Sequence, residues 1–443
     1  MIESPVRNKN RTNPDLTITT VWSMYFLEFS RCLSKTSFIE SILFSDICRQ
    51  SVVSMTNRTG SLNNQARLKC ISRSLGLVES VRLIRIDLVI LLRRLKASKY
   101  IYTMSKKDRG QFYTVNHSYI MDGLDKPTTK VIEPFAGKGD LLDWLGHDNW
   151  EAYDIDPKRD DILHRDTLTE PPCYKDSFII TNPPYLARNK CSSKDIFDKY
   201  KTNDLYKCFI TSLVQQEHGC LGGIFIIPAG FFLSPRDVDT ECRDAFMSKY
   251  KITKVKYFEE TVFPDTPTTV VAFSFVKSDV PLTSQQVVWE QRPSGTCKTF
   301  EMKKENKWII GGDIYNLKTN PDVKISRFVK DRGHENITNL TLCALDSGTE
   351  NGRIHLKYEK DYVYQGIDTS RTFATLCIKG VKLSEDDQVE ITKKFNRFLE
   401  SRRKRDWSLF LPQYRESKEY ARKRIPFDLA YRIVSNLLLS HSK

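Results

Sequence analysis

Ser177-Phe178-Ile179-Ile180-Thr181-Asn182-Pro183-Pro184-Tyr185 is an apolar, β-branched run that stops at two prolines. Residues 177–181 predict a buried strand, because β-branched and aromatic side chains pack well on a pleated surface. The prolines cannot donate ladder hydrogen bonds, so they predict a loop directly after the strand. Open α/β folds bind ligands at the carboxyl edge of their sheet. An amide, a free carbonyl oxygen and a ring at this edge suit a planar group that carries an NH2.

The segment from Met104 to about Asp279 alternates short strands with helices. We expect strands at Lys130–Glu133, Trp150–Tyr153, Ser177–Thr181, Gly222–Pro228, Val255–Phe258 and Thr269–Val276, and a short strand-like turn at Ile162–His164. Helices are expected at Leu141–Leu145 and Leu205–Glu217. Such alternation predicts a parallel sheet that is covered by helices on both faces.

The two flanking segments differ in character from this one. Residues 1–103 are basic and carry no motif, and apolar spacing predicts one helix there, Ser74–Leu95. We treat them as an N-terminal extension of unclear role, either an extra module or a segment outside the functional unit. After about residue 280 the strands become short, turns become frequent, and the chain ends in a basic helical stretch. The expected domains are therefore residues 1–103, 104–285 and 286–443.

Composition and charge bound the class of protein. The 443 residues include 69 Lys and Arg and 55 Asp and Glu, which gives a net charge of +14. This excess is either an ordinary soluble surface or the mark of a polyanionic partner, most often nucleic acid. Eleven scattered cysteines show no zinc-site spacing, and their odd number argues against a disulfide framework. Without a membrane-length apolar run or a signal-peptide layout, we expect a soluble intracellular protein, in the cytoplasm or wherever its target resides.

A glycine loop and two acidic residues precede the Asn-Pro-Pro-Tyr sequence. Glu133-Pro134-Phe135-Ala136-Gly137-Lys138-Gly139 follows a strand and opens a helix, so its backbone N–H groups can approach a ligand. Asp154 ends the next strand, where a carboxylate can accept both hydroxyls of a ribose. Asp166 can accept from an adenine amino group. An ordinary tight turn, a helix cap or a solvated charge are the alternatives, but the combination favours a nucleoside-containing cofactor.

These features in this order resemble the S-adenosylmethionine-dependent amino-methyltransferases. Gly110-Gln111-Phe112-Tyr113-Thr114 looks like the family's first cofactor motif, with Val115 in place of the customary proline. With this motif first, the glycine loop next, Asn182–Tyr185 after it and a separate domain last, the order is similar to the gamma group of DNA adenine-N6 methyltransferases, as in type II restriction–modification systems. The resemblance covers roughly residues 105–277.

The resemblance implies a fold, a cofactor and a set of site residues. The fold would be α/β, with a Rossmann-like methyltransferase sheet covered by helices on both faces, plus a smaller α+β C-terminal target-recognition domain. The cofactor would be S-adenosyl-L-methionine, with no metal. Cofactor-binding roles would fall on Tyr113, Thr114, Glu133, Gly137, Gly139, Asp154 and Asp166. Catalytic roles would fall on Asn182, Pro183, Tyr185 and Phe263.

The expected mechanism follows from the residue types. The Asn182 side-chain oxygen and the Pro183 carbonyl would accept the two N–H protons of an adenine amino group, freeing its lone pair for the methyl group. Tyr185 and Phe263 would sandwich the base, although Phe263 alone also suits an ordinary core position. A paired adenine must first flip out of the duplex.

Several alternatives stay open. Transfer to cytosine carbon-5 is disfavoured because no cysteine follows a proline in residues 182–185, and cytosine N4 transfer is usually paired with Ser-Pro-Pro-aromatic. An RNA adenine-N6 methyltransferase, a protein glutamine N5-methyltransferase and an inactive nucleic-acid binder remain. We expect double-stranded DNA as the partner, a monomer, and possible functional pairing with a separately encoded restriction endonuclease without a stable complex. Ser370–Thr372 and the basic run 402–405 are candidates for DNA contact.

Overall fold

The computed structural model describes residues 109–439, apart from 267, 331–335, 347–352, 368 and 415–421. The helix predicted at Ser74–Leu95, like every expectation for residues 1–103, lies outside the described residues. Within the described residues, no helix is long and apolar enough to cross a membrane.

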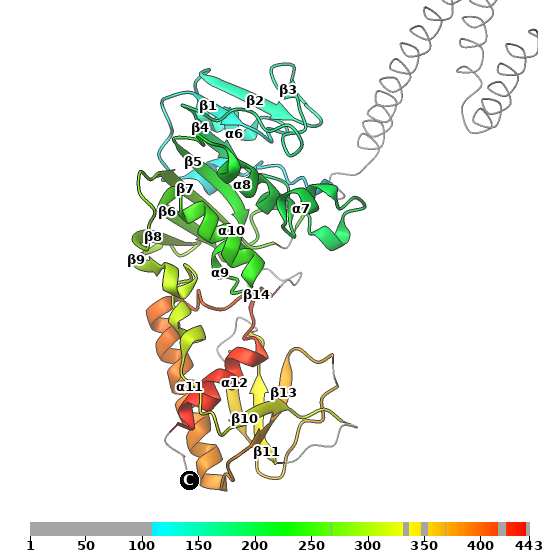
Figure 1. Ribbon diagram of the computed structural model, residues 1–443, viewed down its shortest axis with the longest axis vertical. Coiled ribbons are helices and arrows are strands. Elements are labelled where there is room, and N and C mark those ends of the chain that lie inside the picture. Colours follow the sequence, from blue (N-terminus) through cyan, green and yellow to red (C-terminus); the bar gives the residue numbers. More distant parts are fainter. Residues whose placement is uncertain are drawn as a thin grey trace, which may run out of the picture. The chain divides into compact units, whose positions relative to one another are not determined.

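A nine-stranded sheet forms the larger part of the described chain (Figure 1). Its order is β3-β2-β1-β4-β5-β7-β6-β8-β9. The strands are β1 (Val131–Glu133), β2 (Trp150–Asp154), β3 (Leu163–His164), β4 (Phe178–Thr181), β5 (Gly222–Pro228), β6 (Tyr250–Phe258), β7 (Val270–Lys277), β8 (Ser284–Arg292) and β9 (Thr296–Lys303). Strands β1 to β5 pair in parallel, whereas β7 runs antiparallel to both β5 and β6. All seven predicted strands are present, and β8 and β9 are additions that the sequence reading missed.

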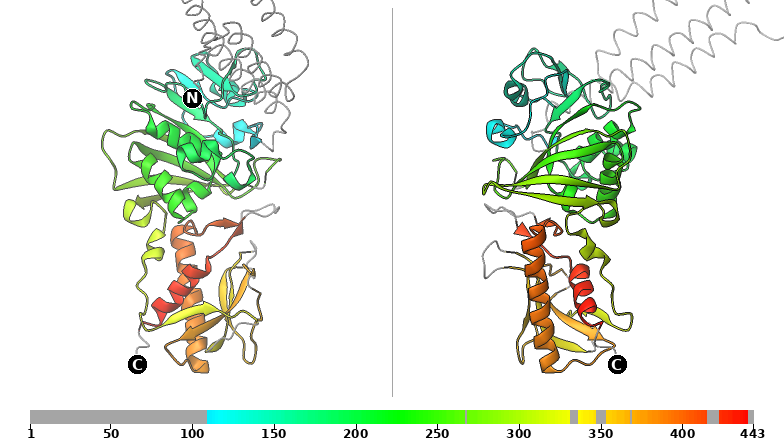
Figure 2. Two further views of the ribbon diagram at one scale, coloured as in Figure 1. Left: turned by 45° about the vertical axis from the view of Figure 1, so that its right-hand side comes forward. Right: turned by 90° about the vertical axis from the view of Figure 1, so that its left-hand side faces the viewer.

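Helices cover both faces of this sheet (Figure 2). They are α5 (His117–Met121), α6 (Asp140–Leu145), α7 (Asp195–Tyr200), α8 (Leu205–Gln215), α9 (Gly230–Leu233) and α10 (Asp237–Met247), with a short 3-10 turn η1 (Arg188–Lys190). The chain leaves β1 in one direction, towards β2, and leaves β4 in the other, towards β5. Right-handed crossovers therefore place α6 on one face and α8 on the opposite face. The predicted Rossmann-like α/β sheet is confirmed, and its switch point lies between β1 and β4.

The burial pattern of each strand fits its position in the sheet. All seven residues of β5 are buried, as expected for a central strand with helices on both faces. In β8, by contrast, buried and exposed residues alternate along much of the strand, which is typical of a sheet with one face open to water. This polar alternation is why β8 and β9 looked like part of the charged C-terminal region in the sequence.

The C-terminal part is α+β, as predicted. A four-stranded antiparallel sheet has the order β10-β13-β11-β12 and packs against two helices. Its elements are β10 (Lys324–Arg327), β11 (Ile337–Cys343), β12 (His355–Tyr358), β13 (Phe373–Lys379), α11 (Glu385–Asp406) and α12 (Phe427–Leu437), accompanied by the short pair β14 (Gln413–Tyr414) and β15 (Arg422–Lys423). Two 3-10 turns, η2 (Lys304–Asn306) and η3 (Gly312–Asn316), lie between the two sheets in the sequence. The elements share a hydrophobic core distinct from that of the nine-stranded sheet.

The longest helix, α11, shows how sequence sets its bounds. Ser384 Oγ accepts from the backbone N of Asp387 at 3.1 Å, and Asp387 Oδ2 accepts from the Ser384 backbone N at 2.9 Å. This reciprocal capping box satisfies two N–H groups that a helix start leaves free. Ile391, Phe395 and Leu399 then follow at helical spacing and are buried in the C-terminal core.

Candidate active site at the switch point of the sheet

A pocket opens where β1 and β4 end. It is lined by Phe112, Tyr113, Thr114, Glu133, Phe135, Ala136, Gly137, Asp140, Leu141 and Asn182. The loop before α5, the glycine loop after β1 and the end of β4 thus meet at one place. Of the predicted site residues, the structure brings five to this pocket: Tyr113, Thr114, Glu133, Gly137 and Asn182. A pocket at this point is what the open α/β architecture leads one to expect.

Glu133 is a buried carboxylic acid at the end of β1, with a side chain that is 1% exposed. Its Oε1 accepts from Thr181 Oγ1 at 2.6 Å and from the Phe135 backbone N at 3.0 Å. Its Oε2 is buried and has no hydrogen-bond partner among the described residues. Burial raises the pKa of Glu133 to about 8, in spite of the two bonds that favour the ionised form. A carboxyl group in this state is suited to receive a cationic ligand group.

The glycine loop is tight enough to require glycine. Gly137 has φ +56°, and a Cβ there would lie 2.9 Å from Tyr113 Cε1. Gly139 has φ +85° and precedes the first turn of α6. Both conformations are ones that residues with a Cβ rarely adopt. The loop therefore brings its backbone against the Tyr113 ring at the pocket wall.

Asp154 fixes the shape of this loop from the end of β2. Its side chain is buried, and Oδ2 accepts from the Gly137 backbone N at 2.8 Å while Oδ1 accepts from the Asp156 backbone N at 2.8 Å. Burial raises the pKa of Asp154, although both of these bonds oppose that shift. Gln111 Nε2 lies 3.5 Å from Oδ1, which ties the first motif to the same carboxylate. Contact with a ribose stays a prediction for Asp154.

Asn182 is held by three partners. Its Nδ2 donates to the Phe112 carbonyl oxygen at 2.7 Å and to Thr114 Oγ1 at 3.1 Å. Its Oδ1 accepts from the Tyr185 hydroxyl. The Asn-Pro-Pro-Tyr loop and the first motif, about seventy residues apart in the chain, are thus joined through one side-chain amide.

The remaining predicted residues lie outside the lining of this pocket as the described residues form it. Asp166 accepts from the Leu168 backbone N at 3.2 Å, which matches the loop-charge alternative. Pro183 is buried beside Asn182. The side chains of Tyr185 and Phe263 are 5% and 2% exposed and belong to the core of the large sheet. Because both rings are covered, neither presents an open face to a base in this structure, and their stacking roles stay predictions.

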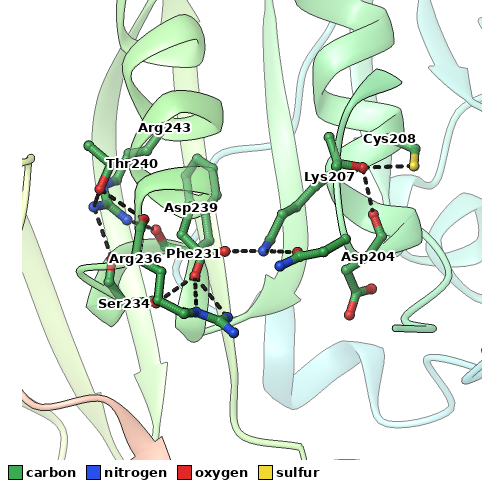
Figure 3. A network of polar contacts seen from close by, with 11 residues as sticks. Asp204, Lys207, Cys208, Phe231, Ser234, Arg236, Asp239, Thr240 and Arg243 are labelled. Atoms are coloured by element: carbon green, nitrogen blue, oxygen red, sulfur yellow. Dashed lines mark hydrogen bonds and ion pairs between the residues drawn. The ribbon is translucent and has the colours of Figure 1, made fainter. Parts of the chain in front are cut away.

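Sequence reasoning missed a polar network behind the site, between α8 and α10 (Figure 3). Lys207 on α8 donates to Asp239 on α10, and both side chains are almost fully buried. Asp239 also accepts from Ser234 Oγ at 2.5 Å. Burial raises the pKa of Asp239, but the Lys207 ammonium, the Ser234 hydroxyl and the Arg236 guanidinium together lower it overall. The partners are 32 residues apart, so no spacing rule in the sequence signals the pair.

The three arginines of the basic run 402–405 form ion pairs within the fold. Arg402 is buried and donates to Asp406 at 3.2 Å and to Asp313 at 2.7 Å. Arg403 pairs with Glu400, and Arg405 pairs with Asp406. Arg371, in contrast, is exposed and makes no hydrogen bond or ion pair with the described residues. Arg371 and the exposed Lys404 are thus the members of the two candidates that stay available for DNA contact.

The central segment matches a known protein family. Residues 174–263, which include Asn182 and Phe263, match the model of the Eco57I restriction-modification methylase family. This match confirms the predicted resemblance to restriction–modification methyltransferases over that segment, and it agrees with the predicted methyl donor, S-adenosylmethionine. Comparison with curated protein sequences gives no match.

Parts of several solved structures are similar to parts of this chain. A modification subunit of a putative type I restriction enzyme from Vibrio vulnificus YJ016 is 15% identical, with a TM-score of 0.34, over 53% of this chain and 54% of that one. A putative class I S-adenosylmethionine-dependent methyltransferase from Listeria monocytogenes is 15% identical, with a TM-score of 0.32, over 46% of this chain and 73% of that one. The type IIG restriction endonuclease BpuSI is 12% identical, with a TM-score of 0.31, over 51% of this chain and 36% of that one. This chain spans about half the length of the first of these proteins.

Proposed function

We propose that this chain transfers a methyl group from S-adenosylmethionine to the N6 amino group of a flipped-out adenine in a specific double-stranded DNA sequence. Such methylation would protect DNA from an endonuclease that recognises the same sequence. The observation that carries the proposal is the position of Asn182. It directly follows β4 within a segment that matches restriction–modification methylases, and it lines one pocket with Thr114, Glu133 and Gly137.

The pocket suits the cofactor. When bound, S-adenosylmethionine supplies a methyl group that is activated by the positive charge on sulfur. The buried Glu133 Oε2, which has no protein partner among the described residues, would accept from the ammonium group of the methionine moiety. The backbone of the glycine loop would lie against the cofactor, and Asp154 would keep that loop in shape while it holds the ribose. Asp166 would contact the cofactor adenine.

Cofactor binding is expected to depend on pH through Glu133. In the empty site its pKa is about 8, so at pH 7 the carboxyl group is mostly protonated. An ammonium group beside Oε2 favours the ionised form, and binding at pH 7 should therefore release close to one proton. Affinity should rise as the pH rises from about 5.5 to 7.5, a range in which an α-amino group stays mostly cationic.

Calorimetry in two buffers with different ionisation enthalpies measures this proton release. Glu133→Gln serves as the matched control, since it should bind without proton release and with a flat pH dependence. The same raised pKa predicts that the empty protein loses stability as the pH rises from about 4.5 to about 8, because only the unfolded state ionises freely there. Equal proton release by wild type and Glu133→Gln would remove Glu133 from this role.

Asn182 and Pro183 would carry out the catalytic work. The adenine amino group is a poor nucleophile because its lone pair is delocalised into the ring. The amide oxygen of Asn182 and the carbonyl of Pro183 would each accept one N–H, which localises the lone pair on nitrogen. These bonds strengthen as positive charge develops on the nitrogen, so they lower the energy of the transition state more than that of the bound substrate. After transfer the nitrogen returns to neutrality by losing a proton.

The C-terminal α+β part, within proposed domain 286–443, would recognise the target sequence. Arg371 is exposed in the loop before β13, and the Arg327 guanidinium anchors that loop through the Ser370 carbonyl at 2.6 Å. Ile367 nearby has a side chain that is 65% exposed. A free arginine on a loop fixed to a sheet suits readout of base edges or phosphates.

Replacing Arg371 with alanine is expected to lower kcat/KM for DNA methylation about 10- to 100-fold. Cofactor affinity should not change, because the loop leads into β13, which packs in the C-terminal core and not in the core of the nine-stranded sheet. The matched control is Arg405→Ala, which removes the same charge from an arginine already paired with Asp406. Equal effects of the two substitutions on methylation of genomic DNA would contradict a specific role for Arg371.

The substrate class is tested by supplying labelled S-adenosylmethionine with duplex DNA, structured RNA and bacterial protein in parallel. The proposal expects the label in DNA. Label in RNA would favour the RNA adenine enzyme, and label in protein would favour the glutamine enzyme. The basic C-terminal part favours nucleic acid over protein, because it adds to a net charge of +14.

A further inference from the structure

The orientation of the Asn182 amide is dictated by its partners. The Phe112 carbonyl oxygen can only accept a hydrogen bond, and it lies 2.7 Å from Asn182 Nδ2. The NH2 group must therefore face Phe112 and Thr114. Oδ1 must then face the hydroxyl of Tyr185, whose single proton is shared between Oδ1 and the Ile226 carbonyl oxygen. An amide oxygen accepts two hydrogen bonds, so one lone pair of Oδ1 remains for a substrate N–H.

Tyr185 is held in place, and its hydroxyl faces two acceptors, Asn182 Oδ1 and the Ile226 carbonyl oxygen. Its backbone N donates to the Gly110 carbonyl at 2.8 Å, and its hydroxyl also lies 2.6 Å from the Ile226 carbonyl oxygen on β5. Phe112 and Tyr206 flank the ring, with centroids 5.6 Å and 6.3 Å away. Burial raises the pKa of Tyr185 well above 10, so the hydroxyl keeps its proton at any working pH. The Tyr185 side chain is therefore buried among Phe112, Tyr206 and β5.

From this geometry we propose that Thr114 and Tyr185 are positioning residues, whose two hydroxyls hold the Asn182 amide with its oxygen directed to the substrate amino group. The proposal rests on the proposed function and deepens it. A half-turn of the amide would present NH2 to the substrate NH2, placing donor against donor. Without the two hydroxyls, only the Phe112 carbonyl would oppose that turn.

The proposal gives Tyr185 a role through its hydroxyl, which differs from ring stacking on the base. Stacking requires the ring alone, and phenylalanine retains the ring. Tyr185→Phe therefore separates the two roles. Thr114 offers a second separation: Thr114→Val removes the acceptor for Asn182 Nδ2 at constant volume, and Thr114→Ser restores it.

Steady-state methylation of plasmid DNA tests the proposal in these variants. Tyr185→Phe and Thr114→Val should each lower kcat about tenfold, the size expected for one net hydrogen bond, with KM for DNA and Kd for the cofactor changed less than about threefold. Thr114→Ser should recover most of the kcat that Thr114→Val loses. Stacking predicts a wild-type kcat for Tyr185→Phe, and a role of Thr114 in cofactor binding predicts a weaker Kd in Thr114→Val. Either result would overturn the proposal.

A second measurement needs no turnover. In protein labelled with 15N asparagine, the side-chain NH2 signal of Asn182 is identified by its loss in Asn182→Ala. It should shift and broaden in Tyr185→Phe and in Thr114→Val, but not in Thr114→Ser. An unchanged signal in Tyr185→Phe overturns the proposal even if the wild-type protein methylates no nucleic acid, whereas that absence of activity would by itself overturn the proposed function.

Discussion

Replacing Asn182 with alanine is expected to lower kcat for methyl transfer about 100- to 1,000-fold, the loss seen when one group that stabilises developing charge is removed. The amide oxygen would be the acceptor that draws the amino lone pair towards the methyl group, and alanine offers no acceptor. Cofactor binding should persist, because Glu133, Gly137 and Asp154 hold their geometry through bonds that do not include Asn182.

The measurement for Asn182→Ala is single-turnover methylation of DNA with the cofactor in excess, accompanied by calorimetry for cofactor affinity. Asn189→Ala is the matched control, since Asn189 is an exposed asparagine in the 3-10 turn η1, a few residues farther along the chain. Full activity of Asn182→Ala would remove the proposed mechanism. Loss of cofactor binding together with activity would place Asn182 in the cofactor site instead.

Replacing Arg243 with methionine is expected to cost about 3–5 kcal/mol of stability, the range for breaking a buried charged network. Arg243 lies on α10 and is fully buried (Figure 3). Its Nε donates to the Lys307 carbonyl oxygen at 2.7 Å, and its other nitrogens donate to the carbonyl oxygens of Phe231 and Ser234. Methionine would fill the space but leave three carbonyl groups, two of them on buried residues, without this donor.

Differential scanning calorimetry measures this loss, which should lower Tm by roughly 5–15 °C. Burial lowers the pKa of Arg243 to about 10, so the side chain stays charged at neutral pH and its hydrogen bonds are charge-assisted. The control is Arg236→Met, because the Arg236 side chain is 68% exposed and should contribute less than about 1 kcal/mol. If both variants melted at the same temperature, Arg243 would not be the anchor that this geometry indicates.

The parts of the fold that follow local rules were predictable. β4 and β5 are continuous apolar runs, and their bounds match the predicted ones to within one residue. The glycine loop was also predictable, because the positive φ angles of Gly137 and Gly139 demand the residue type that marks it. Phe112 lines the pocket, and its carbonyl oxygen accepts a hydrogen bond from Asn182. The residue lies within the motif Gly110–Thr114, but the motif predicted no role for it.

Features that depend on distant partners were not predictable from one sequence. Arg402 looked like part of a solvated basic run, but it is buried and pairs with the half-exposed Asp313, 89 residues away. The Lys207–Asp239 pair and the hydroxyl contact of Tyr185 with Ile226 are likewise tertiary. β8 and β9 were missed because their alternating polar residues resemble those of a separate antiparallel domain. In each case the sequence gives the residue type but not the distant residue that contacts it.

The identity of the methylated nucleoside tests the central claim most directly. Duplex DNA would be incubated with the full chain and S-adenosylmethionine carrying a deuterated methyl group, digested to nucleosides and analysed by mass spectrometry. We predict labelled N6-methyldeoxyadenosine with wild-type protein and its loss with Asn182→Ala. Label in N4-methyldeoxycytidine, or no labelled nucleoside from DNA at all, would contradict the account.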